Sequence, residues 1–241
     1  MEPQSISQTT IQTPAPLIAF HGDPRIKAKY LRRIRAHRKA DELVRGRGWD
    51  NGKGCAIGCT LNAYDHQAYE TELGIPELIA HLEDSIFEGL PVAEAMEWPD
   101  KFLAAIPVGA DLSNVIPQIV VWQFEDVKWG LQNTEEVKDS PKLRELCVDL
   151  VALYRRKLDG GIVMDCEWES IYDRAWAGTW AGAGAWAWAR ARARAWAGAG
   201  AWARARARAW AGAEPKAYNA LAEKLLQLVT DAPVQLAKAR K

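Results

Sequence analysis

Two cysteines and a histidine beside a basic, glycine-rich stretch are the residues best suited to chemistry. Cys55 and Cys59 lie four positions apart just after Lys53, and His66 follows. A cysteine near a helix start and a basic side chain can have a lowered pKa, and a histidine can accept its proton. The pattern supports a thiol-dependent enzyme in which Cys55 or Cys59 is the nucleophile and His66 the base, oriented by Asp65. The alternative is two small buried side chains that pack a turn.

The same stretch gives weaker support for a metal or a phosphate ligand. Cys55, Cys59, His66 and His81 could ligate zinc, but their spacing is not a familiar zinc pattern, so no metal and no cofactor is predicted. Residues 45–60, RGRGWDNGKGCAIGCT, contain five glycines. They miss both the phosphate-loop pattern and the dinucleotide fingerprint, which leaves a structural loop as the interpretation.

Adjacent acidic residues are expected on the solvated surface. Glu83-Asp84 and Glu135-Glu136 are pairs of neighbours within charged stretches. A catalytic carboxylate pair needs a shared cleft, which adjacent positions do not indicate.

A low-complexity repeat from Arg174 to Ala213 dominates the second half of the chain. Alanine occupies nearly every second position, and Trp, Arg, Gly and Thr179 fill the rest. Alanine and arginine are strong helix formers, and the paired glycines at 182–184 and 198–200 could end short helices. We therefore expect short helices. Strands are the alternative, because strict alternation places all alanines on one face.

Positive charge is concentrated in two segments of a chain whose net charge is zero. The repeat carries seven Arg and no acid, and residues 25–47 hold ten Lys and Arg against two acids. Interleaved Trp and Arg suit phosphate contacts and stacking. This pattern predicts a non-enzymatic protein that binds an acidic partner, either a host protein or nucleic acid, and it also suggests a homo-oligomer through the repeat. The expected binding residues are Arg190, Arg192, Arg194, Arg204, Arg206, Arg208, Trp186, Trp188, Trp202 and Lys53.

Helical periodicity and capping signals predict a mainly α fold. Residues 1–16 are expected to be a disordered tail, 17–160 a helical domain, and 161–241 the repeat and a terminal helix. Proline and capping residues predict helices from Pro24, Pro76, Pro99 and Pro141, and a further helix is favoured over a strand at 112–127. The chain shows no signal peptide and no long apolar run, so we expect a cytoplasmic protein without a membrane span.

Three sequence blocks resemble uncharacterised proteins of bacteriophages and prophage-bearing bacteria. The blocks are GWDNGKGCAIGCTL at 48–61, IPVGADL at 106–112, and an alanine-rich repeat that ends in AEKLLQLV at 222–229. The alanine-rich tail is also distantly similar to bacterial immunity-like helical proteins. The resemblance implies a phage or mobile-element origin and action in a bacterial host cell, and it brings no assigned activity.

Overall fold

The computed structural model describes residues 17–177 and 215–235, and this part of the chain is mainly helical. The predicted fold class is therefore confirmed for these residues, whereas the repeat lies outside them. The helices are α1 Pro24–Lys39, α2 Ala56–Leu61, α3 Ala68–Leu73, α4 Glu77–Gly89, α5 Val92–Ala105, α6 Val115–Glu125, α7 Glu135–Asp139, α8 Pro141–Leu158, α9 Asp165–Ala177 and α12 Pro215–Thr230. Two short 3-10 helices, Ala19–Gly22 and Leu131–Asn133, and the strands β1 Trp49–Asp50 and β2 Lys53–Gly54 complete the fold.

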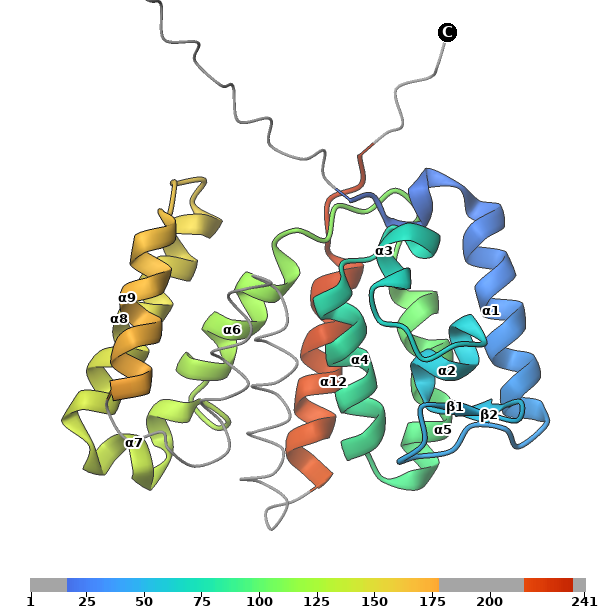
Figure 1. Cartoon of the computed structure of the whole chain (residues 1–241), viewed down its shortest axis with the longest axis horizontal. Helices are drawn as coiled ribbons and strands as arrows, with labels where there is room; N and C mark the ends of the chain where they lie inside the picture. The colour runs from blue at the N-terminus through green and yellow to red at the C-terminus, as the bar shows by residue number, and fades with distance from the viewer. Residues whose placement is uncertain (1–16, 178–214, 236–241) are drawn as a thin grey trace, which may run out of the picture.

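The helices form an arc with α1 at one end and the α8–α9 pair at the other (Figure 1). Helix α12 lies beside α4 and packs on α4, α5 and α6. Its Leu225 and Val229 are fully buried in the same cluster as residues of α4 and α5. The last described helix therefore contributes to a core built mainly by the first half of the chain.

Two of the predicted helix starts are capped as expected. Asp23 Oδ1 accepts the backbone N–H of Arg25 at 2.8 Å, and Ser140 Oγ accepts that of Leu143 at 3.3 Å. In both helices proline occupies the first turn, where its missing N–H costs nothing.

The predicted helix start at Trp98-Pro99 is wrong. Helix α5 begins at Val92, directly after Pro91, so Pro99 lies in its interior. The carbonyl of Pro91 accepts the N–H of Ala95 at 2.9 Å and makes the first turn. Trp98 and Pro99 are buried, and this packing offsets the backbone hydrogen bond that an interior proline removes.

The glycine-rich stretch folds as a hairpin followed by a helix. β1 and β2 pair in antiparallel register around Asn51-Gly52, whose φ angles of 50° and 80° are both positive. Asn-Gly is the commonest sequence for this tight turn, because both central residues need positive φ. The hairpin places Cys55 at the entry to α2, against helix α4.

The IPVGADL block joins the two ends of the described chain. Ala19 N–H donates to Ala110 O at 2.9 Å, and Asp111 N–H donates to Pro233 O at 2.8 Å. Gly109, with φ +85°, lies in the turn that forms these hydrogen bonds. Backbone pairing therefore gives the IPVGADL block a structural role.

Candidate functional site

A pocket of about 430 Å³ opens between the hairpin stretch, helix α4 and helix α12. We call it the Asp84 pocket. Its lining includes Arg47, Cys55, Tyr64, Asp84, Ser85 and Tyr218. A pocket of this size can hold a small molecule.

Helix α4 supplies the polar wall of the pocket. His81, Asp84, Ser85 and Glu88 all line it and follow the i, i+3, i+4, i+7 spacing, so they share one helical face. Residues 46–48 and Tyr218 cover this face. A polar face that would otherwise meet solvent is thereby enclosed.

Asp84 lies at the centre of the polar contacts. Its Oδ2 accepts the Tyr64 hydroxyl at 3.3 Å and lies 3.2 Å from His66 Nε2. Burial alone would raise the pKa of Asp84, but its contacts with His66, the Cys55 thiol and Tyr64 outweigh burial and hold the pKa below its usual value. Asp84 is therefore a carboxylate at neutral pH, and its Oδ1 is buried without a hydrogen-bond partner among the described residues.

Two stacked histidine rings lie next to Asp84, and one of them, His81, lines the pocket. His66 and His81 stack with ring centroids 3.9 Å apart and an interplanar angle of 12°. His66 also meets the edge of Tyr64 at 4.9 Å, and His81 Nε2 lies 3.4 Å from Glu77 Oε1. Each imidazole thus has a carboxylate on one side and the other imidazole on its face.

The two candidate cysteines have different surroundings. Cys55 lines the Asp84 pocket, and burial together with the negative charge of Asp84 raises its pKa. The thiol of Cys59 donates to Gly54 O at 3.4 Å, and burial raises its pKa to about 11. Both are thiols at neutral pH, which is the opposite of the lowered pKa that the sequence suggested.

The structure brings some of the sequence-predicted residues together and separates others. Cys55 and His66 both contact Asp84, whereas Lys53 is exposed on β2 and does not line the pocket. Asp65 does not orient His66. Its Oδ1 instead accepts the backbone N–H groups of Gln67 and Ala68 at 3.0 and 3.2 Å, as a turn-forming aspartate does.

The interpretation of Glu83-Asp84 as solvated surface is wrong. Glu83 is fully buried and Asp84 nearly so, because α4 is covered on several sides by α2, α5, α6 and α12. Sequence reasoning missed Asp84, Ser85 and Glu88 for this reason. The available signal was the helical spacing of polar residues from His81 to Glu88, within a helix whose other buried residues are apolar except for Glu83.

Only part of the predicted binding surface falls within the described residues. Arg190, Arg192, Arg194, Arg204, Arg206, Arg208, Trp186, Trp188 and Trp202 lie outside the described residues. Within residues 25–47, eight of the ten cations contact a carbonyl, hydroxyl or carboxylate of the chain itself. In the described part, Arg32 and Lys39 are the two without such a contact, and four of the other eight, Arg25, Arg35, Arg38 and Arg47, pair with a carboxylate.

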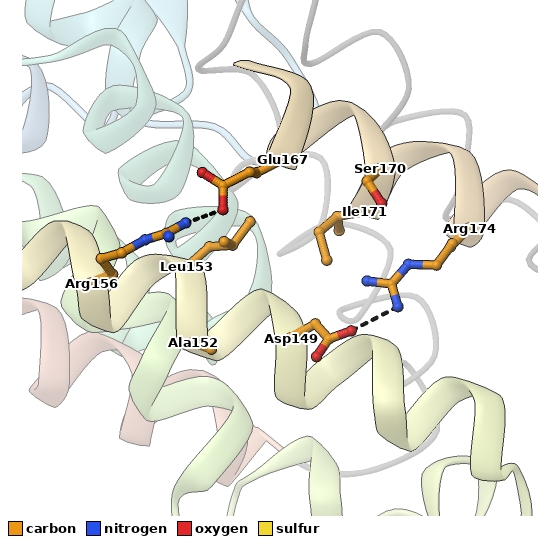
Figure 2. A pocket seen from close by; sticks show the side chains of 8 residues that line it. All are labelled: Asp149, Ala152, Leu153, Arg156, Glu167, Ser170, Ile171 and Arg174. Atoms are coloured by element: carbon orange, nitrogen blue, oxygen red, sulfur yellow. Dashed lines mark hydrogen bonds and ion pairs between the residues drawn. The ribbon is translucent and has the colours of Figure 1, made fainter. Parts of the chain in front are cut away.

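A second pocket, of about 410 Å³, lies between α8 and α9 (Figure 2). Arg174 pairs with Asp149 at 2.7 Å, and Arg156 pairs with Glu167, which lowers the pKa of that carboxyl. Figure 2 shows these two ion pairs bridging the helices over an apolar floor of Ala152, Leu153 and Ile171. The charges of this pocket are matched within the chain, whereas Asp84 of the first pocket has one oxygen, Oδ1, that is buried without a hydrogen-bond partner among the described residues.

Among the described residues, no group of three or more His, Cys, Asp or Glu side chains is arranged to hold a metal ion. None of the described helices is long and apolar enough to cross a membrane. The chain matches no protein-family model, no curated protein and no solved structure. The relation to phage proteins thus remains a prediction. The proposal for function depends on the Asp84 pocket.

Proposed function

We propose that this protein binds a small polar molecule in the Asp84 pocket. The observation that carries the proposal is a pair of buried polar atoms on two residues that line the pocket, Asp84 Oδ1 and Ser85 Oγ, which have no hydrogen-bond partners among the described residues. Leaving such an atom buried and unpaired costs about 1–3 kcal/mol. A ligand that pairs with both atoms recovers this free energy.

The pocket also has the composition of a ligand site. It combines a few polar groups with the rings of Tyr64, His81 and Tyr218. Binding pockets typically pair apolar or aromatic walls with a small number of placed polar groups that fix orientation. Among the described residues, no buried side-chain polar atom of the α8–α9 pocket lacks a hydrogen-bond partner, so this pocket serves as the internal control.

A fragment screen by ligand-observed NMR tests the proposal. We expect some fragments to bind the wild-type protein and to bind Asp84→Asn and Ser85→Ala more weakly, because these variants change the unmatched atoms. Asp149→Asn, in the α8–α9 pocket, should leave the same fragments unaffected. If no fragment binds at millimolar concentration, or if all bind the Asp84 and Ser85 variants equally well, the proposal is wrong and water pairs with these atoms.

The second candidate function is thiol chemistry at Cys55. It is favoured by one observation, the position of this thiol in the pocket wall beside Asp84, which also contacts His66. A nucleophilic Cys55 would have to transfer its proton to Asp84 or His66 before attacking a substrate. The raised pKa of Cys55 opposes this step in the protein alone.

Alkylation at neutral pH separates the two candidates. Cys166 is exposed, so the measurement uses Cys166→Ser as the background. A thiol enzyme requires Cys55 to react with iodoacetamide faster than free glutathione, with Cys55→Ser losing that reaction. A binding pocket with a protonated, buried Cys55 predicts slower reaction than glutathione.

A further inference from the structure

We infer that the molecule bound in the Asp84 pocket is an organic cation, with an ammonium or amidinium group that donates to Asp84 Oδ1. The inference rests on the proposed function and names the class of ligand.

The acceptor is a carboxylate with one used and one unused oxygen. Oδ2 already meets Tyr64 and His66, and the side chain is about nine-tenths buried. An ionised carboxylate can only accept hydrogen bonds, so the partner of Oδ1 has to be a donor. A charged N–H donor makes a hydrogen bond roughly twice as strong as a neutral one.

The arginines near the pocket are directed to other acceptors. Arg47 pairs with Asp50 at 3.2 Å, and Arg45 donates to Leu90 O at 2.9 Å and to Glu88 O at 2.5 Å. Among the described residues, neither guanidinium is hydrogen-bonded or ion-paired with Asp84. The strongest unmatched group in the wall is thus negative, which disfavours an anionic ligand.

Glu88 adds a second carboxyl four residues along the same helical face. Its oxygens accept the backbone N–H of Gly46 at 2.8 and 3.0 Å, which fixes the loop over the pocket. Burial, followed by the charge of Asp84, raises the pKa of Glu88. Glu88 is therefore a weaker acid than a solvated glutamate, and its oxygens are already engaged by the loop.

Aromatic rings held by close glycine contacts form the other walls. A Cβ at Gly48 would lie 2.6 Å from the Tyr64 ring, and one at Gly89 would lie 2.0 Å from the Tyr218 ring. The glycines thus let both rings pack directly on backbone. Tyrosine faces attract cations, so a pocket lined by the Asp84 carboxylate and by the rings of Tyr64 and Tyr218 is suited to an organic cation.

Three probes of matched shape test the ligand class: benzylamine, benzyl alcohol and sodium benzoate. Isothermal titration of the full chain near neutral pH should give the lowest Kd for benzylamine, by about tenfold over benzyl alcohol, with benzoate weakest. Asp84→Asn should weaken benzylamine by a similar factor and leave benzyl alcohol nearly unchanged. The wild-type protein alone provides a second readout, since benzylamine should shift the ring resonances of Tyr64 and Tyr218.

The outcomes distinguish the two proposals. If benzyl alcohol or benzoate binds as tightly as benzylamine while still losing affinity in Ser85→Ala, the cation inference is wrong and the pocket remains a ligand site. The cation inference is also wrong if benzylamine binding is unchanged in Asp84→Asn. If neither these probes nor the fragments bind, both proposals are wrong.

Discussion

Glu83 and Asp84 are neighbours in the chain with opposite electrostatic states. Tyr69 donates its hydroxyl to Glu83 Oε2 at 2.7 Å, and complete burial raises the pKa of Glu83 well above its usual value. Asp84 has a lowered pKa because of its polar contacts. Burial therefore favours the neutral acid at Glu83, whereas polar contacts favour the carboxylate at Asp84.

The neutral Glu83 predicts a pH-dependent loss of stability. Above about pH 4.5, the ordinary pKa of glutamate, the unfolded chain releases a proton that the folded chain retains. The free energy of unfolding then decreases by at most about 1.4 kcal/mol per pH unit, until the pH reaches the folded pKa. Asp84 has the opposite sign, because its contribution is lost as pH falls through its folded pKa.

We expect Glu83→Gln to be more stable than the wild type at pH 8 and to show a flatter pH dependence between pH 5 and 8. The amide preserves the shape and the acceptor for Tyr69 without an ionisable proton. Denaturant unfolding at several pH values measures this, and Glu94→Gln, at an exposed position on α5, is the matched control. A slope in Glu83→Gln equal to that of the wild type would show that Glu83 is ionised in the folded protein.

At the scale of elements, the hairpin stretch is held to α2 by a backbone contact. A Cβ at Gly58 would lie 1.9 Å from Gly48 O, and the same carbonyl accepts the N–H of Cys55 at 3.1 Å. The glycine inside α2 thus lets the pocket-forming loop sit directly on the helix. This close approach determines where Cys55 lies relative to Asp84.

Gly58→Ala should destabilise the protein although alanine favours helices by about 1 kcal/mol over glycine. The added methyl group meets backbone, which cannot rotate away, and overpacking of this kind typically costs about 1–3 kcal/mol or more. Thermal and denaturant unfolding measure the difference. Ala36→Gly, at an exposed position of α1, calibrates the propensity effect in this protein. A stabilised Gly58→Ala would contradict the contact.

Local signals in the sequence identified most elements but not the site. Asp23-Pro24 and Ser140-Pro141 mark α1 and α8 because capping is a property of adjacent residues. Pro99 misled the prediction of α5, since only tertiary packing tolerates proline in a helix interior. Asp84 and Tyr218 are 134 positions apart, and no local pattern predicts that α12 covers α4.

At the scale of the whole molecule, the two positive segments differ in how far their charge is available. The chain itself engages most cations of residues 25–47, whereas the Arg residues at 190–208 belong to a segment without acids. If the acidic partner is nucleic acid, we expect binding to depend on the repeat. Replacing its six Arg at 190–194 and 204–208 by Gln should abolish binding, and Arg32→Gln/Lys39→Gln should not.

A titration of single-stranded DNA at several salt concentrations measures this. Six phosphate contacts would give a slope of about −4 in log K against log salt. Binding that is absent at low salt would contradict the nucleic-acid form of the hypothesis and leave an acidic protein partner to be tested. Equal loss in the Arg32 and Lys39 variant would place the contact on α1 instead.

The position of α12 predicts that the chain on both sides of the repeat unfolds as one unit. Leu225 is fully buried among residues of the common cluster, so Leu225→Ala should lower the free energy of unfolding by about 2–5 kcal/mol through the cavity it leaves. Because α12 also covers the Asp84 pocket through Tyr218, the variant should weaken the binding of any ligand in that pocket.

Denaturant unfolding followed by circular dichroism and by tryptophan fluorescence should give coincident single transitions. The exposed Glu223→Ala on the same helix should leave stability nearly unchanged. Two separate transitions, with only one shifted by Leu225→Ala, would show that α12 folds independently of α4.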